Sequence, residues 1–240
     1  MTARTRRVRR SAAVHPLGVV VLLALGVGAL SAQTSPSDPT DVQAWYATKL
    51  TLDLPDKWEA SLQYRARYAD DASGWKGGYV TTEVGKGLSK TWSLTASHRL
   101  AVVDGGTFHR LAAGATWERK AGATRLSLRG LVQHQFENFD ANDEGSGTAQ
   151  TFLRTRLQVR RTLSPTVAVY ASAEPYFTFV GSYPIDNWRN TVGTRIGLGD
   201  GRTLDLFYIY RPDYAKAYNR TFHVVGVDLD FDLKVRRRGR

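Results

Sequence analysis

From Asp41 onward, the chain alternates apolar and polar residues with a period of two. In residues 57–68 every even position is apolar or aromatic, and every odd position is polar or charged. The even positions hold Trp58, Ala60, Leu62, Tyr64, Ala66 and Tyr68, and the odd positions hold Lys57, Glu59, Ser61, Gln63, Arg65 and Arg67. Successive side chains of a β-strand point to opposite faces, so this period predicts strands with one apolar and one polar face. Helical spacing is nowhere competitive, and the pattern predicts an all-β protein.

About eleven segments share this alternation, and most of them are unusually long. Ordinary soluble strands have about 5–6 residues, whereas a tilted strand needs about 9–11 residues to cross a bilayer. We therefore expect an antiparallel up-and-down transmembrane β-barrel of about 10 to 12 strands within residues 41–234. The expected strands are residues 41–54, 57–70, 77–88, 91–103, 107–119, 123–138, 148–162, 166–180, 187–198, 202–212 and 219–233.

The connections between these segments alternate in length. Five are tight: Pro55-Asp56, Ser89-Lys90, Ala121-Gly122, Ser164-Pro165 and Asp200-Gly201. Most of the others are longer, and short periplasmic turns opposite long external loops are typical of outer-membrane barrels. An odd number of strands conflicts with the even number usual in bacterial barrels. Either one strand is missed or merged, or the N-terminal segment threads the lumen.

Aromatic residues at apolar-face positions form two groups along the predicted strands. Trp58, Trp92 and Trp117 lie near tight turns. A second group lies near the longer loops: Tyr68, Phe179, Trp188 and Tyr210. Outer-membrane barrels carry such aromatic girdles at both membrane interfaces. The alternative is that these residues form the core of a soluble protein.

The N-terminal segment has the composition of a signal peptide. Residues 1–10 are rich in arginine, and residues 16–30 contain no charge. Residues 29–32 (ALSA) supply the small side chains that a signal peptidase needs at its cleavage site. We expect a cleaved signal peptide over residues 1–32, a linker over 33–40, the barrel over 41–234 and a basic tail over 235–240. A retained membrane anchor is the alternative. This organisation predicts export to the outer membrane of a Gram-negative type bacterium.

The net charge of +11, from 33 Lys and Arg against 22 Asp and Glu, lies mainly at the two ends of the chain. The middle is close to neutral, so no surface for a phosphate backbone is expected and nucleic acid is not a predicted partner. The chain has no Cys, which excludes disulfides and cysteine-based metal sites. We expect no cofactor and no metal.

The polar faces of the strands place many charges of both signs toward the lumen. In a small barrel such charges most often pair across strands and fill the interior. The alternative is a cationic wall that selects anionic solutes, part of which Glu174 could neutralise. The lumen-facing candidates are Arg125, Arg129, Arg154, Arg156, Arg160 and Glu174.

The sequence offers no catalytic constellation. Ser97 and His98 are neighbours on a strand and therefore point to opposite faces. His98 and His134 fall at apolar-face positions, whereas His109 and His223 fall with polar or loop-end residues. We expect no enzyme, and an outer-membrane lipid hydrolase built from separate strands is the alternative.

Several short phrases resemble one known family. They are residues 41–45 (DVQAW), 56–62 (DKWEASL), 89–96 (SKTWSLTA), the Arg154/Arg156 strand with 173–176 (AEPY), and 205–211 (DLFYIYR). Over residues 41–234 the chain is similar to the bacterial outer-membrane β-barrel family known as domain of unknown function 2490. The resemblance implies an outer-membrane barrel without an established activity, and it assigns no functional residues.

These observations predict a structural barrel or a narrow porin-like channel with an Arg-rich lumen. The alternatives are an adhesion or docking protein that works through residues 138–147 and 181–186, and the lipid hydrolase. The expected partners are outer-membrane lipid, lipopolysaccharide and, during insertion, the barrel-assembly machinery. The ligand is not predicted.

Overall fold

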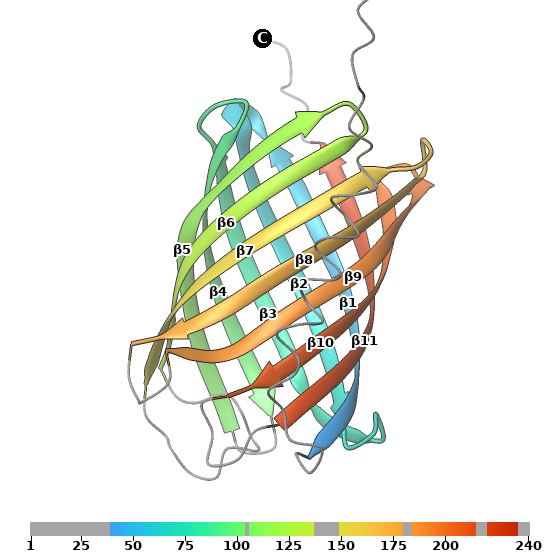
Figure 1. The fold of residues 1–240 in the computed structure, drawn as a ribbon. Coiled ribbons are helices and arrows are strands. Elements are labelled where there is room, and N and C mark those ends of the chain that lie inside the picture. Colours follow the sequence, from blue (N-terminus) through green and yellow to red (C-terminus); the bar gives the residue numbers. More distant parts are fainter. Residues whose placement is uncertain (1–38, 104–105, 137–148, 180–183, 215–219, 235–240) are drawn as a thin grey trace, which may run out of the picture. The chain divides into compact units, whose positions relative to one another are not determined.

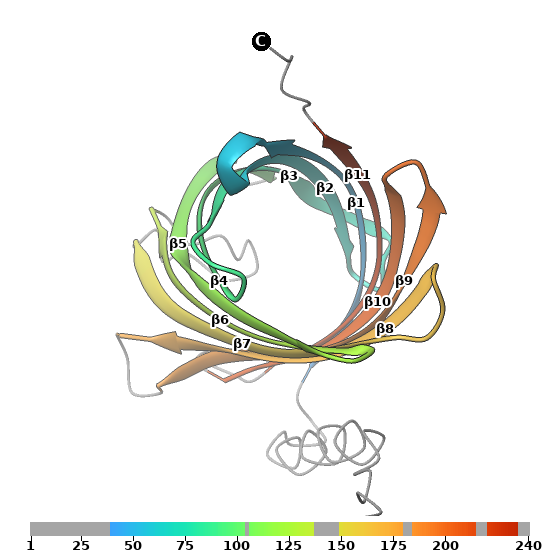
Figure 2. The same ribbon diagram turned by 90° about the horizontal axis from the view of Figure 1, so that it is seen from above.

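The computed structural model describes residues 39–103, 106–136, 149–179, 184–214 and 220–234. Within them eleven strands form one closed barrel, seen from the side in Figure 1 and along its axis in Figure 2. All eleven expected segments are strands. Their bounds are β1 Thr40–Leu54, β2 Trp58–Ala69, β3 Gly74–Gly87, β4 Trp92–Val103, β5 Gly106–Ala121, β6 Thr124–Gln135, β7 Gln150–Thr162, β8 Val167–Thr178, β9 Ile185–Gly199, β10 Arg202–Asp213 and β11 Arg220–Lys234.

The barrel closes through a parallel pair of strands. Each strand pairs antiparallel with its neighbour in sequence, but β1 pairs with β11 in parallel register, from Thr40 opposite Thr221 to Asp53 opposite Lys234. The fully antiparallel barrel expected from the sequence is therefore correct except at this seam. When eleven strands alternate in direction, the first and the last run the same way. The odd count needs no missing strand, and residues 40–54 lie in the barrel wall and not in the lumen.

The two ends of the barrel differ in their connections. The five tight turns all lie at one end, called here the turn end, where residues 55–57 form a short 3-10 turn. The opposite end, called here the loop end, is where β2, β4, β6, β8 and β10 end and the strands that follow them begin. Residues 104–105, 137–148, 180–183 and 215–219, which fall between these strands in the sequence, are outside the described part of the chain. β1 begins at the loop end, whereas β11 ends at the turn end (Figure 1).

The outward face of the barrel is apolar. Large side chains that a soluble protein would bury are about half exposed, including Leu62 (49%), Leu128 (50%), Val192 (54%) and Val225 (55%). Charged and amide side chains alternate with them and point inward. A band of apolar side chains around a charged interior is the arrangement expected for a barrel surrounded by lipid. None of the described residues belongs to a helix long and apolar enough to cross a membrane.

Candidate functional site

In the loop-end half of the lumen, inward-facing side chains pack against one another. One apolar cluster contains Trp45, Ile209, Phe222 and Val224, with Phe207 against it. A second cluster contains Tyr79, Ala101 and Val103, with Phe108 against it. These two clusters lie on different parts of the wall, β1 with β10 and β11, and β3 with β4 and β5. The remaining space between the walls is polar.

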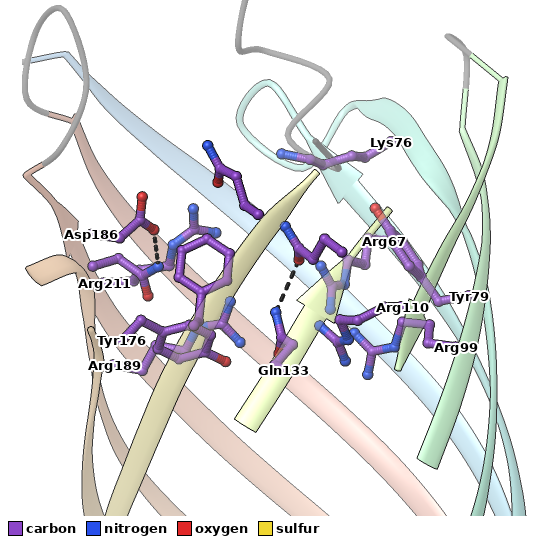
Figure 3. A pocket seen from close by; sticks show the side chains of 14 residues that line it. Arg67, Lys76, Tyr79, Arg99, Arg110, Gln133, Tyr176, Asp186, Arg189 and Arg211 are labelled. Atoms are coloured by element: carbon purple, nitrogen blue, oxygen red, sulfur yellow. Dashed lines mark hydrogen bonds between the residues drawn. The ribbon is translucent and has the colours of Figure 1, made fainter. Parts of the chain in front are cut away.

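This polar space is a cavity of about 80 Å³, called here the loop-end cavity (Figure 3). Six of its lining side chains are basic and one, Asp186, is acidic. They come from nine of the eleven strands and converge because each lies on the inward face near the loop end. The lining residues are Arg67, Lys76, Tyr79, Arg99, Arg110, Gln133, Gln135, Gln150, Phe152, Tyr176, Asp186, Asn187, Arg189 and Arg211.

Aromatic rings hold several of these guanidinium groups in place. Arg67 lies 4.0 Å from the ring centroid of Trp45 and 4.2 Å from that of Tyr79. Arg154 and Arg189 each lie 4.4 Å from the ring centroid of Tyr176. Guanidinium groups are attracted to the faces of aromatic rings, so this stacking orients Arg67 and Arg189 without neutralising their charge. Arg154 differs, because it lies outside the lining of the cavity and also pairs with Glu174.

Much of the positive charge at the loop-end cavity has no carboxylate partner. Arg99 donates from Nε to Thr81 Oγ1 at 3.0 Å, a neutral acceptor. The buried Nε atoms of Arg67 and Arg189 and the buried hydroxyl of Tyr176 have no hydrogen-bond partner. Four arginines of the lining form no salt bridge within the described part of the chain: Arg67, Arg99, Arg110 and Arg189.

The arginines predicted from the sequence also lie on the inward face, but several of them have carboxylate partners, unlike those four arginines of the loop-end cavity. Glu174 accepts from Arg129 at 2.7 Å and from Arg154 at 3.0 Å, and Arg154 also donates to Gln133 at 2.7 Å. Arg125 pairs with Glu118 at 2.5 Å. Glu174 therefore neutralises part of the expected wall, which was one of the two alternatives open at the sequence level.

Arg156 and Arg160 complete the predicted set. They alternate with Arg154 on the inward face of β7, toward the turn end. None of the six predicted lumen candidates, Arg154 included, lines the loop-end cavity. Sequence reasoning gave Arg156 and Arg160 the same weight as Arg154, because the period of two fixes the face of a side chain but not its level in the barrel.

The turn-end half of the lumen is rich in carboxylates. Asp228 pairs with Arg65, and Arg195 contacts Asp230 at 3.1 Å and Asp205 at 3.9 Å. The hydroxyl of Tyr170 donates to Asp205 at 3.0 Å. The interior is therefore polarised along the barrel axis, with excess cations at the loop end and carboxylates that bind arginines nearer the turn end.

The predicted girdle aromatics lie on the outside of the barrel, near its two ends. At the turn end Trp92 is directly opposite Trp117 across β4 and β5, and Lys86 lies 4.6 Å from the Trp58 ring. At the loop end Tyr68 is 5.3 Å from Trp75. The other three loop-end aromatics are Trp188, Tyr210 and Phe179. Trp188 donates to Asn190 at 2.7 Å, and the ring of Tyr210 is 5.7 Å from that of His223. Phe179 is 67% exposed.

The four histidines of the described strands face outward. His98 Nε2 lies 3.0 Å from His109 Nδ1, His134 Nδ1 lies 2.8 Å from Thr151 Oγ1, and His223 Nδ1 lies 2.6 Å from the Tyr208 hydroxyl. In the described strands no histidine forms a salt bridge with a carboxylate, and no three potential metal ligands gather. The prediction that His109 and His223 lie with polar or loop-end residues is wrong, since both face outward. Sequence reasoning therefore missed the contact between His98 and His109.

The fold and its interior define a closed β-barrel with an apolar exterior and a charged lumen. The chain matches the family described as proteins of unknown function, DUF2490, over residues 42–222, and it belongs to this family. The resemblance inferred from short sequence phrases is thereby confirmed.

Among solved structures the chain is similar to the NanC porin. The two share 13% sequence identity and a TM-score of 0.50, over 71% of this chain and 86% of that one. At this identity the similarity shows a shared fold. A comparison with curated proteins gives no match.

Proposed function

We propose that this protein is a narrow outer-membrane channel that favours small anions. The observation that supports the proposal is the group of four lumen arginines without carboxylate partners, Arg67, Arg99, Arg110 and Arg189, around the loop-end cavity. Clustered cations in a restricted space repel one another and incoming cations. A diffusing anion relieves this repulsion, so its free energy in the constriction is lower than that of a cation of the same size.

The size of the cavity sets the expected class of solute. A volume of 80 Å³ accommodates only a few water molecules, each of which occupies about 30 Å³ in the liquid. The arginines that stack on Trp45, Tyr79 and Tyr176 are held by packing, so the constriction keeps its charge and its width. We therefore expect passage of small inorganic anions and short carboxylates, with a low conductance. No cofactor and no catalytic residue is part of the proposal.

The test is single-channel recording on the refolded barrel under an asymmetric KCl gradient. The wild type should give a reversal potential of anion-selective sign. One elementary charge at about 4 Å contributes about 1 kcal/mol even in bulk water, and it acts on an anion and on a cation with opposite sign. Arg110→Gln should therefore change the difference between the two ions by about 2 kcal/mol and lower the anion-to-cation permeability ratio about thirtyfold. Arg110→Glu should lower it further, because it replaces the cation by an anion.

The matched control is Arg202→Gln. Arg202 pairs with Asp200 at the exposed β9–β10 turn, far from the loop-end cavity, so the permeability ratio should not change. Heat-modifiable gel migration shows that each variant has folded. Silence from a folded wild-type barrel would overturn the channel proposal. That outcome would favour adhesion or docking through residues 138–147 and 181–186, or lipid hydrolysis.

A further inference from the structure

The outer face of β4, β5 and β6, together with the neighbouring edge of β3, is hollowed. A groove of about 550 Å³, called here the β4–β6 groove, runs across these strands. Its floor includes Ala96 and Ala113, which are paired across β4 and β5. In the next row toward the loop end His98, Leu111 and His134 stand side by side across the three strands. Small side chains beside larger ones create the hollow.

His98 lines this groove, His109 lies beside it in contact with His98, and both lie within the apolar band of the barrel. His98 is six residues from Trp92 along β4, and His109 is eight residues from Trp117 along β5. At about 3.3 Å per residue and a tilt of about 40°, these imidazoles lie roughly 15 to 20 Å above the turn-end girdle, in a band about 25 Å tall. An ionisable side chain at such a depth indicates a functional site.

The paired imidazoles leave a donor that the protein does not use. A neutral imidazole has one N–H and one acceptor nitrogen, and His98 and His109 share one hydrogen bond of 3.0 Å between Nε2 and Nδ1. Whichever ring donates, the other retains its own N–H. Within the described strands no protein acceptor takes it. Hydrocarbon offers no acceptor either, so an unsatisfied N–H at this depth costs free energy.

We propose that the β4–β6 groove binds one bilayer lipid, with an acyl chain in the hollow and an ester carbonyl oxygen that accepts the free imidazole N–H of the His98–His109 pair. The groove is continuous with the apolar surface that already faces lipid. The ester oxygen supplies the partial negative charge that complements the N–H, and the chain fills a hollow that would otherwise stay poorly packed. The site is separate from the lumen, so it does not depend on whether the barrel conducts.

The experiment is native mass spectrometry of the refolded barrel with added diacyl phosphatidylethanolamine. The wild type should retain one lipid more strongly than the rest. The dialkyl ether analogue lacks the ester carbonyls, and its retention should be about fivefold weaker, the effect of one hydrogen bond. His98→Phe with His109→Phe should bind the diester and the ether lipid equally, because these rings keep the apolar surface but remove the donor.

Ala113→Leu fills the groove and should abolish the retained lipid. Ala44→Leu is the matched control, because Ala44 is an outward-facing alanine on β1, four strands away around the barrel. Equal retention by Ala113→Leu and wild type would overturn the proposal. A dimer that only Ala113→Leu disrupts would overturn it as well, since a second copy of the chain would then cover the groove. Heat-modifiable migration again reports folding.

Discussion

At the scale of single residues, the arginines of the lumen differ mainly in what surrounds their charge. Arg129 and Arg154 share the carboxylate of Glu174, whereas Arg67 and Arg189 stack on aromatic rings and face the loop-end cavity. A shared carboxylate removes most of the field of two cations, but an aromatic ring leaves it available to a solute. The two groups should therefore respond differently to substitution, the first in stability and the second in selectivity.

Glu174 is the residue for which a large loss of stability is expected. Its side chain is buried between two arginines, and Glu174→Gln would leave both charges uncompensated. Loss of one partner from a buried ion pair costs about 3 to 5 kcal/mol, so the free energy of unfolding should fall by about that amount. Urea unfolding of the refolded barrel in lipid vesicles measures it.

Glu118→Gln is the matched comparison for that prediction. The Glu118–Arg125 pair also lies in the lumen, but both side chains are 39% exposed, and exposed pairs contribute only about 0 to 1 kcal/mol. If both substitutions cost the same, the stabilising role of Glu174 as a bridge between two cations is wrong.

At the scale of elements, the strands and their turns could be predicted from the sequence, but the closure of the barrel could not. Alternation reports which residues form a strand and which face they take, so all eleven segments were recognised. It contains no information about which strand pairs with which at the ends of the chain. The predicted odd number of strands therefore conflicted with the even number usual in bacterial barrels. The parallel pairing of β1 with β11 resolves this conflict.

For the candidate site too, the sequence predicts the face on which a side chain lies but not its contacts. Alternation placed Arg154 and Glu174 on the inward face, but their contact depends on the register between β7 and β8, which local patterns do not set. The His98–His109 contact is diagonal across β4 and β5, and it follows only once His98 is known to pair with Leu111. Register, more than residue type, separated the predicted site from the observed one.

The parallel seam can be tested with engineered cysteines. Thr48 and Leu229 are register partners on β1 and β11, and adjacent strands are about 4.8 Å apart, within reach of a disulfide. The chain has no cysteine of its own, so Thr48→Cys with Leu229→Cys gives no background cross-link. We expect a disulfide in the folded barrel, visible by non-reducing gel migration and lost with reductant.

The control pair for the seam shifts one partner along β11. Val225 pairs with Ala44 and lies four residues from Leu229, so Thr48→Cys with Val225→Cys should stay reduced. A cross-link in the control pair at the expense of the first pair would show that the register of the seam is different.

At the scale of the whole molecule, an odd number of strands places the two ends of the barrel sequence at opposite ends of the barrel. β1 begins at the loop end and β11 ends at the turn end, so Pro39 and Lys234 lie about one membrane thickness apart. If the longer connections face the outside of the cell, the segment before β1 emerges there, while the segment after β11 enters the periplasm.

Epitope insertion in intact cells tests this arrangement. An epitope before Pro39 should be labelled by antibody without permeabilisation, together with one inserted between Ser73 and Gly74 in the β2–β3 connection at the same end. Epitopes after Gly122, in the β5–β6 turn, and after Lys234 should be labelled only once the outer membrane is opened. An even-stranded barrel would make the epitopes before Pro39 and after Lys234 behave alike, so joint labelling of these two contradicts the parallel closure. If only the epitopes after Gly122 and Lys234 are labelled in intact cells, the parallel closure holds but the barrel has the opposite orientation in the membrane. The cationic loop-end cavity would then lie on the periplasmic side.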